Sequence, residues 1–285
     1  MKTLDEALYN TLYAQAAVAD ALYDIAGKAV GLPVHKLLGG ECRDRVRVSG
    51  LLAMKPTGAE ILESAQSFYD RGFRHFGLKI GVDPKQDLAN VVALRDRFGD
   101  QVVIRVDANG ALTYDEALAL LRKLEPHDID AAEQPIAIWD LEGLAALARA
   151  TSIPIMADES VSTDHSLLEV IRRRAATVVQ TKIAKNGGMY RVWRLWALAS
   201  AAGMRIYPGN HPSTSVATAA VAQLCAAWPG PLMEGVFAVG VSGALAADIV
   251  TEPLAPVNGE IRVPTRPGLG VELDPAAIER FRIDR

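Results

Sequence analysis

VVIRVDANG, residues 102–110, joins a run of β-branched residues to a charged side chain and a turn. The apolar residues 102–106 predict a short buried strand, and Asp107 stands where that strand ends. Residues 114–124 follow with helical periodicity. This part of the chain therefore predicts one unit of a strand followed by a helix.

The same unit recurs along most of the chain. Apolar runs predict eight strands, near residues 46–52, 75–80, 102–106, 129–132, 153–157, 177–181, 204–207 and 232–236. Helical periodicity predicts seven helices between them, at residues 58–69, 86–98, 114–124, 141–150, 166–174, 189–201 and 214–227. Such alternation is typical of parallel strands with right-handed crossovers. We predict an α/β fold, a modified TIM barrel of the (β/α)7β type; a doubly wound open sheet is the alternative.

Three parts are expected along the chain. Residues 1–44 are predicted as a helical lead-in, a remnant of a capping region, with its helix over residues 4–28. Residues 45–240 are predicted to form the barrel. Residues 241–285, rich in Gly and Pro, are expected to form a loose extension that packs against the barrel or the cap.

Composition narrows the class of protein. Of the 285 residues, 50% are hydrophobic and 22% are charged, so the chain can bury a large core. The net charge of −4 comes without a basic stripe, which argues against a nucleic-acid partner. The two cysteines lie far apart, and the first residues are acidic rather than basic and apolar. We therefore expect a cytoplasmic protein without a disulfide framework, a signal peptide or a membrane span.

Five consecutive predicted strands end on an ionisable residue: Lys79, Asp107, Glu133, Asp158 and Lys182. In a closed barrel the C-terminal ends of the strands line one mouth, where the active sites of such barrels lie. The five side chains are therefore expected to converge. Three carboxylates brought so close repel one another unless a cation compensates their charge. Ligands that are all oxygen favour Mg²⁺, with Mn²⁺ as the alternative.

The two lysines stand one strand before and one strand after the carboxylates. A lysine beside a divalent cation and another ammonium is pushed toward its neutral form, which makes it a competent base. Lysines on both sides of a carboxylate substrate are suited to removing the proton next to that carboxylate, and a metal ion stabilises the resulting enediolate.

These motifs resemble the enolase superfamily, and within it the muconate-lactonizing enzyme subgroup of the mandelate racemase/muconate lactonizing enzyme family. They are residues 21–40 (ALYDIAGKAVGLPVHKLLGG), 105–110 (RVDANG), 133–135 (EQP), 156–160 (MADES) and 182–188 (KIAKNGG). The resemblance implies that Asp107, Glu133 and Asp158 bind Mg²⁺. It also implies that Lys79 and Lys182 form the acid/base pair, a mechanism known for this superfamily.

Two features depart from the family pattern. The family usually carries Lys-x-Lys at the end of the second strand, whereas residues 77–79 read Gly-Leu-Lys. Family members also carry an N-terminal α+β capping domain that closes over the barrel mouth, and we expect most of it to be missing from this chain. An open mouth admits water, so weak or no activity is expected from the chain by itself.

Five further residues are candidates for supporting roles. Asn109 resembles the residue that accompanies the first metal ligand, and Glu159 would replace Asp158 as a ligand if the strand register slipped by one. Lys185 is predicted to be a solvated loop residue. His211 is predicted at the rim of the mouth, as a surface histidine or a ligand contact. Glu234, near the end of the eighth strand, is expected to contact the substrate or the base, or to be structural.

The function predicted from the sequence is Mg²⁺-dependent isomerisation of a small carboxylate substrate, of the muconate cycloisomerase type. Racemisation or epimerisation of an amino-acid derivative and dehydration of an acid sugar are the alternatives among enzymes. An inactive structural subunit without its cap is the alternative outside enzymes. The resemblance also implies a homo-oligomer.

Overall fold

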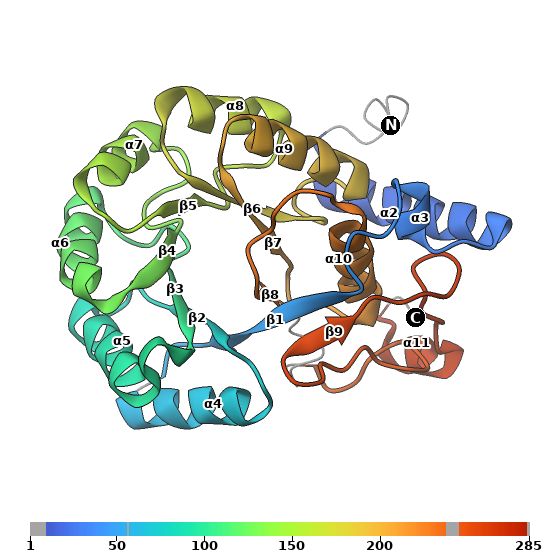
Figure 1. Ribbon diagram of the computed structural model, residues 1–285, viewed down its shortest axis with the longest axis horizontal. Helices are drawn as coiled ribbons and strands as arrows, with labels where there is room; N and C mark the ends of the chain where they lie inside the picture. Colours follow the sequence, from blue (N-terminus) through green and yellow to red (C-terminus); the bar gives the residue numbers. More distant parts are fainter. Residues whose placement is uncertain (1–9, 56, 238–244, 284–285) are drawn as a thin grey trace.

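The computed structural model describes residues 10–55, 57–237 and 245–283. Eight parallel strands form a ring with helices outside it (Figure 1). The strands are β1 (Arg45–Leu52), β2 (His75–Lys79), β3 (Val103–Asp107), β4 (Ile129–Glu133), β5 (Ile155–Ala157), β6 (Val178–Lys182), β7 (Arg205–Gly209) and β8 (Val236–Phe237). The first seven overlap expected apolar runs, whereas β8 shares only Val236 with the expected run at residues 232–236.

A helix follows each of the first seven strands. These helices are α4 (Gly58–Asp70), α5 (Pro84–Phe98), α6 (Tyr114–Leu124), α7 (Leu141–Ala150), α8 (Asp164–Arg173), α9 (Met189–Ala201) and α10 (Ser215–Ala227). Single 3₁₀ turns, η1 (Gly99–Gln101) and η2 (Glu125–His127), follow α5 and α6. At the start of α6, Thr113 accepts a hydrogen bond from the backbone of Glu116, whose side chain bonds back to Thr113. This reciprocal cap fixes where the helix begins.

The sheet closes on itself rather than ending in two open edges. Its strand order is β7-β6-β5-β4-β3-β2-β1-β8, so β1 pairs with both β2 and β8. The backbone N–H of Met233, just before β8, donates to the carbonyl of Ile206 on β7 at 2.8 Å. The segment that enters β8 therefore meets β7, and the arrangement is that of a barrel, not of the alternative open sheet.

Apolar residues pack on both faces of the strands. The larger cluster lies between the strands and the surrounding helices, and it includes Phe76, Ile104 and Trp196. A smaller cluster, of Ala131, Met156, Val178 and Tyr207 with Met233 against it, uses the alternate strand positions and so fills the interior of the barrel.

The ends of the chain differ from the expected lead-in and extension. The first described helix is α2 (Leu12–Val30), which is followed by α3 (Val34–Leu37); the expected start of the helix at residue 4 lies outside the described residues. Beyond the barrel, β9 (Glu260–Arg262) pairs antiparallel with β1, and α11 (Pro275–Phe281) follows. The extension is thus anchored rather than loose.

The eighth strand is shorter than expected and begins later. It covers only Val236–Phe237, and residues 238–244 lie outside the described part. Glu234 therefore precedes β8 instead of standing near its end. Among the described helices, none is both long enough and apolar enough to cross a bilayer.

Candidate active site

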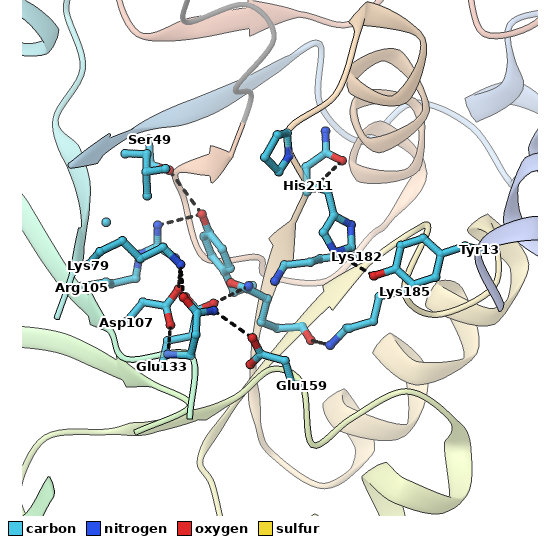
Figure 2. Close-up of a pocket in the computed structure, with 17 residues that line it drawn as sticks. Tyr13, Ser49, Lys79, Arg105, Asp107, Glu133, Glu159, Lys182, Lys185 and His211 are labelled. Atoms are coloured by element: carbon cyan, nitrogen blue, oxygen red, sulfur yellow. Dashed lines mark hydrogen bonds and ion pairs between the residues drawn. The ribbon is translucent and has the colours of Figure 1, made fainter. Parts of the chain in front are cut away.

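The charged residues at the strand ends gather at one mouth of the barrel. Lys79, Asp107, Glu133 and Lys182 are the last residues of β2, β3, β4 and β6, and Asp158 directly follows β5. Parallel pairing aligns Lys79 with Asp107, and Asp107 with Glu133. Four of the five line a cavity of about 440 Å³ (Figure 2). Asp158 lies fully buried behind Lys182, to which it is bonded.

Lys79 is held by Asp107, at the end of β3, and by Asn109, in the turn that follows. Its Nζ donates to Asp107 Oδ2 at 2.5 Å and to Asn109 Oδ1. The backbone N–H of Asn109, a residue with a φ of +45°, donates to Asp107 Oδ1 at 2.9 Å. Its side-chain amide also donates to Glu159 Oε1 at 2.8 Å. Asn109 and Glu159, both candidates from the sequence, therefore belong to one hydrogen-bond chain with Lys79.

Asp158 accepts hydrogen bonds from two lysines. Lys182 Nζ donates to Oδ2 of Asp158, and Lys185 Nζ donates to Oδ1 at 2.7 Å and to the Asp158 carbonyl. Burial acts to raise the pKa of the Asp158 carboxyl, but the two ammonium groups outweigh it and hold that pKa well below its usual range. Lys185 is only 8% exposed, so the prediction of a solvated loop residue is wrong.

Glu133 is the carboxylate without a lysine partner. It accepts a hydrogen bond from Gln180 Nε2 at 2.6 Å. Burial raises its pKa well above the usual range, and the neighbouring carboxylates of Asp107 and Asp158 raise it further. The three carboxylates are thus close enough to repel one another.

The chemistry of this donor set fits a hard divalent cation. All three side chains offer only oxygen, and their mutual repulsion is the charge problem that a cation relieves. Among the residues the structure describes, no three carboxylate, imidazole or thiolate groups stand in a ready-made coordination arrangement. Lysine ammonium groups hold Asp107 and Asp158 instead.

Lys79 and Lys182 face each other across the mouth. They stand on β2 and β6, which are four strands apart in a ring of eight. The carboxylates of Asp107, Glu133 and Asp158 come from the strands between them. A molecule placed against the carboxylates would therefore meet one ammonium from each side; Figure 2 shows Lys79 and Lys182 at separate places on the cavity wall.

His211 lies at the rim, as expected from the sequence, and it meets a residue that the sequence did not single out. Its Nε2 lies 3.2 Å from the hydroxyl of Tyr13 on α2, and both side chains line the cavity. Burial, together with the charge of Lys182, lowers the pKa of His211. The imidazole is consequently neutral near pH 7.

Glu234 does not belong to this site. Its carboxylate pairs with Arg47 at 2.8 Å and lies 3.8 Å from the imidazole of His75. Arg47 stands near the start of β1, and His75 is the first residue of β2. The start of a strand lies at the opposite end of the barrel from the mouth that Lys79 and Lys182 line. The predicted contact of Glu234 with the substrate or the base is therefore wrong, because the strand that follows it begins later than expected.

Three polar residues inside the barrel were missed by the sequence analysis. Arg105 and Gln180 stand two positions before Asp107 and Lys182, and Tyr207 stands at the corresponding level of β7. All three line the cavity. Side chains two positions apart on a strand point to the same side, so the alternation in the sequence contained the signal.

The sequence matches known families over most of its length. Residues 60–277 match the family model described as "Enolase C-terminal domain-like". Residues 1–39 match the model of the "Mandelate racemase / muconate lactonizing enzyme, N-terminal domain". The chain belongs to the enolase superfamily and to its muconate-lactonizing enzyme subgroup, which confirms the resemblance seen in the motifs.

Particular relatives share both sequence and fold. Muconate cycloisomerase 1 of Pseudomonas putida is 35% identical, over 99% of this chain and 75% of the relative. N-succinyl-L-Arg/Lys racemase of Bacillus cereus is 28% identical, over 98% of this chain and 74% of the relative. The crystal structure of muconate lactonizing enzyme from Pseudomonas fluorescens in complex with muconolactone has a TM-score of 0.93 and 35% identity, and the match covers 98% of this chain and 75% of that one. The protein is an isomerase of this superfamily.

Proposed function

We propose that this isomerase removes the proton next to the carboxylate of a small substrate and completes a cycloisomerisation of the muconate type through an enediolate. The observation that carries the proposal is the placement of Lys79 and Lys182 on opposite sides of the Asp107, Glu133 and Asp158 carboxylates. Similarity to enzymes named muconate cycloisomerase supports it.

In this proposal Asp107, Glu133 and Asp158 hold Mg²⁺, or Mn²⁺ in its place. The bound cation supplies the positive charge that stabilises the two negative charges of the enediolate. Asn109 and Glu159 keep Lys79 and Asp107 in position through their shared hydrogen bonds. Gln180, on β6, donates a hydrogen bond to Glu133 and so holds it in position.

The protons that are exchanged with the substrate are carried by Nζ of Lys79 and Nζ of Lys182. In the lactone-opening direction one lysine, as the free amine, takes the proton from the carbon beside the carboxylate, leaving the enediolate, and the ring C–O bond then breaks. In the cyclising direction a carboxylate oxygen of the substrate adds to the double bond, the electron pair moves onto the enediolate, and the same nitrogen, as the ammonium, gives the proton back to that carbon. The second lysine then acts as a fixed charge next to the substrate. The buried position of Lys182 restricts the approach of water to this proton.

Racemisation or epimerisation of an amino-acid derivative is the second candidate. It is favoured by the same opposed pair, because inversion at carbon needs one base on each face of the substrate. A relative named N-succinyl-L-Arg/Lys racemase matches the chain as well. The two candidates differ in whether one lysine or both exchange protons with the substrate.

Exchange of deuterium from solvent into the carbon beside the carboxylate tests the proposal. Wild type, Lys79→Ala, Lys182→Ala and the surface control Lys123→Ala are compared with Mg²⁺ on muconolactone and on both enantiomers of N-acyl amino acids. Cycloisomerisation predicts exchange into the lactone that one lysine variant abolishes. Racemisation predicts that each variant loses exchange with one enantiomer and keeps it with the other. Exchange that persists in both variants, or that is absent from wild type, contradicts the proposal.

The proposal extends to a cytoplasmic homo-oligomer. Cys42 and Cys225 are both free thiols, Cys225 being buried, and this supports a reducing compartment.

A further inference from the structure

A second cavity, of about 480 Å³, lies outside the barrel between α2 and α10. Figure 1 shows these two helices next to each other. α2 lines the cavity with residues three or four positions apart, which share one face of a helix: Tyr13, Ala17, Asp20 and Asp24. A concave site of this size is typical of small-molecule binding. We call it the outer cavity.

The other walls of the outer cavity are mostly apolar. They come from the loop after β6, from the first turns of α10 and from the C-terminal extension, and they include Ile183, Val216, Ala217, Leu269 and Leu273. Leu273 is 52% exposed. An apolar molecule bound in the outer cavity would remove such surface from water, which favours binding.

Asp20 brings a negative charge into this apolar surrounding. Its Oδ1 accepts the backbone N–H of Met189 at 3.1 Å, and its Oδ2 accepts no hydrogen bond from the part of the chain that the structure describes. Among the described residues, no lysine, arginine or histidine lies within ion-pair distance of Asp20. Asp24, by contrast, is paired with Lys28 at 2.8 Å and accepts the backbone N–H of Leu269. Asp20 is therefore the carboxylate of the outer cavity that a bound cation can reach.

The chemistry of Asp20 indicates the kind of group that would bind it. Burial raises its pKa to about 6, so the carboxyl group is ionised at pH 8. An ionised carboxylate in an apolar wall is stabilised by a partner that brings both a positive charge and a hydrogen-bond donor. An ammonium group brings both, and the apolar walls suit the hydrocarbon part of the same molecule.

The outer cavity adjoins the catalytic cavity but is distinct from it. Tyr13 and Asn210 line both cavities. The Tyr13 hydroxyl lies 3.2 Å from Nε2 of His211, whose backbone N–H donates to Asn210 Oδ1 at 2.9 Å. Neither Lys79 nor Lys182 is among the described residues that line the outer cavity. A molecule bound there would lie behind the Tyr13 side of the mouth, away from the opposed lysines.

We propose that the outer cavity binds a small amphipathic amine, with Asp20 holding its ammonium group and the apolar walls covering its hydrocarbon part. The unpaired charge of Asp20 is the observation that selects this occupant. The inference goes beyond the proposed function and does not rest on it, because no lysine or carboxylate of the proposed reaction takes part.

Titration calorimetry at pH 8 on the full chain tests the inference. The probes are 4-phenylbutylamine, uncharged 4-phenylbutan-1-ol and anionic 4-phenylbutyrate, each with and without Mg²⁺. Wild type is expected to bind the amine about 10- to 100-fold more tightly than the alcohol, the range of a charge-assisted hydrogen bond. The butyrate should bind more weakly than the alcohol, because Asp20 repels it.

Asp20→Asn is the first variant. It keeps an acceptor for the backbone of Met189, so the fold should accept it, and it is expected to remove the preference for the amine over the alcohol. Asp96→Asn, an exposed aspartate on α5, is the matched control and should bind like wild type.

Ala17→Leu is a second variant, which keeps the carboxylate and fills the space beside it. Ala17 is exposed on α2 and leucine is a good helix former, so the helix should tolerate the change. We expect the amine and the alcohol both to bind at least about tenfold more weakly. Ala14→Leu, exposed on the same helix but not among the lining residues, is the control. If Asp20→Asn does not fold, Ala17→Leu decides the question alone.

The outcomes separate this inference from its alternatives. Equal affinity of wild type for the amine and the alcohol, or a preference that Asp20→Asn retains, overturns it. Sedimentation velocity is run in parallel on wild type and Ala17→Leu. A dimer that Ala17→Leu dissociates, in a wild type that binds no amine, would assign the outer cavity to a second copy of this chain and also overturn the inference. Absence of deuterium exchange in wild type contradicts the proposed function and leaves amine binding at Asp20 standing.

Discussion

Lys185 and Lys182 both line the cavity, and each bonds one oxygen of the Asp158 carboxylate. Lys185 Nζ bonds Asp158 Oδ1 at 2.7 Å and the carbonyl of Gln180 at 3.2 Å. Lys185→Met removes a buried ammonium group, so that Lys182 is the remaining lysine that balances the negative charge of Asp158. We expect unfolding in urea to show a loss of about 3 kcal/mol.

The matched control for Lys185 is an exposed ion pair. Lys36 lies 3.2 Å from Glu41 with 42% of its side chain exposed. Lys36→Met should therefore cost less than about 1 kcal/mol. Equal losses of unfolding free energy in the two variants would show that the buried contact of Lys185 with Asp158 contributes no more to stability than an exposed ion pair.

Substitution of Glu234, by contrast, is predicted to have little effect on turnover or stability. Its carboxylate is 53% exposed at the far end of the barrel, paired with Arg47. Glu234→Gln should keep turnover within about twofold of wild type and change stability by less than about 1 kcal/mol. A loss of turnover comparable to that of Lys182→Ala would show that Glu234 takes part in the reaction.

Lys185 and Glu234 show which kind of contact the sequence does not predict. The strand-end residues were found because a buried strand ends visibly in an apolar run, and a charge there has few places to point. Lys185 lies in a loop, and its burial depends on Asp158, 27 residues earlier. Glu234 was placed by assuming a strand that, in the fold, begins two residues after it. Neither contact is local, so neither left a local pattern.

Among the elements, α2 contacts α9 through a partly buried carboxylate. Asp20 Oδ1 accepts the backbone N–H of Met189, the first residue of α9, at 3.1 Å. Gly188, just before it, has a φ of +109°, and a Cβ there would lie 2.9 Å from Cβ of Ala19. The helix thus approaches α9 closely, and Asp20 is partly buried beside this contact.

Burial raises the pKa of Asp20 to about 6, against a hydrogen bond that acts to lower it. Because the folded pKa exceeds the unfolded value of 3.8, the folded state binds more protons between these values and loses stability as pH rises through them. Asp20→Asn keeps an acceptor for Met189 and carries no charge. It should be about 1–3 kcal/mol more stable than wild type above pH 6.

The pH profile of this difference is the check. Urea titrations of wild type and Asp20→Asn should converge below pH 4, where Asp20 is protonated in both states. A stability difference that does not change between pH 4 and pH 7 would show that the aspartate charge is not its cause.

The sequence predicted the barrel helices better than the elements outside the barrel. Capping residues such as Thr113 mark helix starts in the sequence itself. β9 has three residues and exists because Ile261 pairs with Val46, which is 215 residues earlier. A strand that short carries no periodicity, and its existence depends on a partner that local patterns do not reveal.

At the scale of the whole molecule, closure of the sheet is what assembles the site. Each of the five strands from β2 to β6 ends on or just before one charged group, and no two neighbouring strands would suffice, since the opposed lysines stand on β2 and β6. The fold therefore concentrates four acidic groups, Asp107, Glu133, Asp158 and Glu159, around one cavity or at its edge. Sequence spacing predicted this gathering, but the lysine contacts that compensate it appear only in three dimensions.

That charge balance predicts how the folded protein responds to Mg²⁺. An ion that binds the folded state alone stabilises it, by about 2.7 kcal/mol at 100 times its dissociation constant. Thermal and urea unfolding of wild type should show this gain in millimolar Mg²⁺ at constant ionic strength. Asp107→Asn combined with Glu133→Gln should abolish it without lowering the stability of the metal-free protein, because the substitution also removes repulsion among buried carboxylates. Glu142→Gln, whose carboxylate is 79% exposed on α7, is the control and should keep the full response. A gain in the double variant equal to that of wild type would place the ion elsewhere.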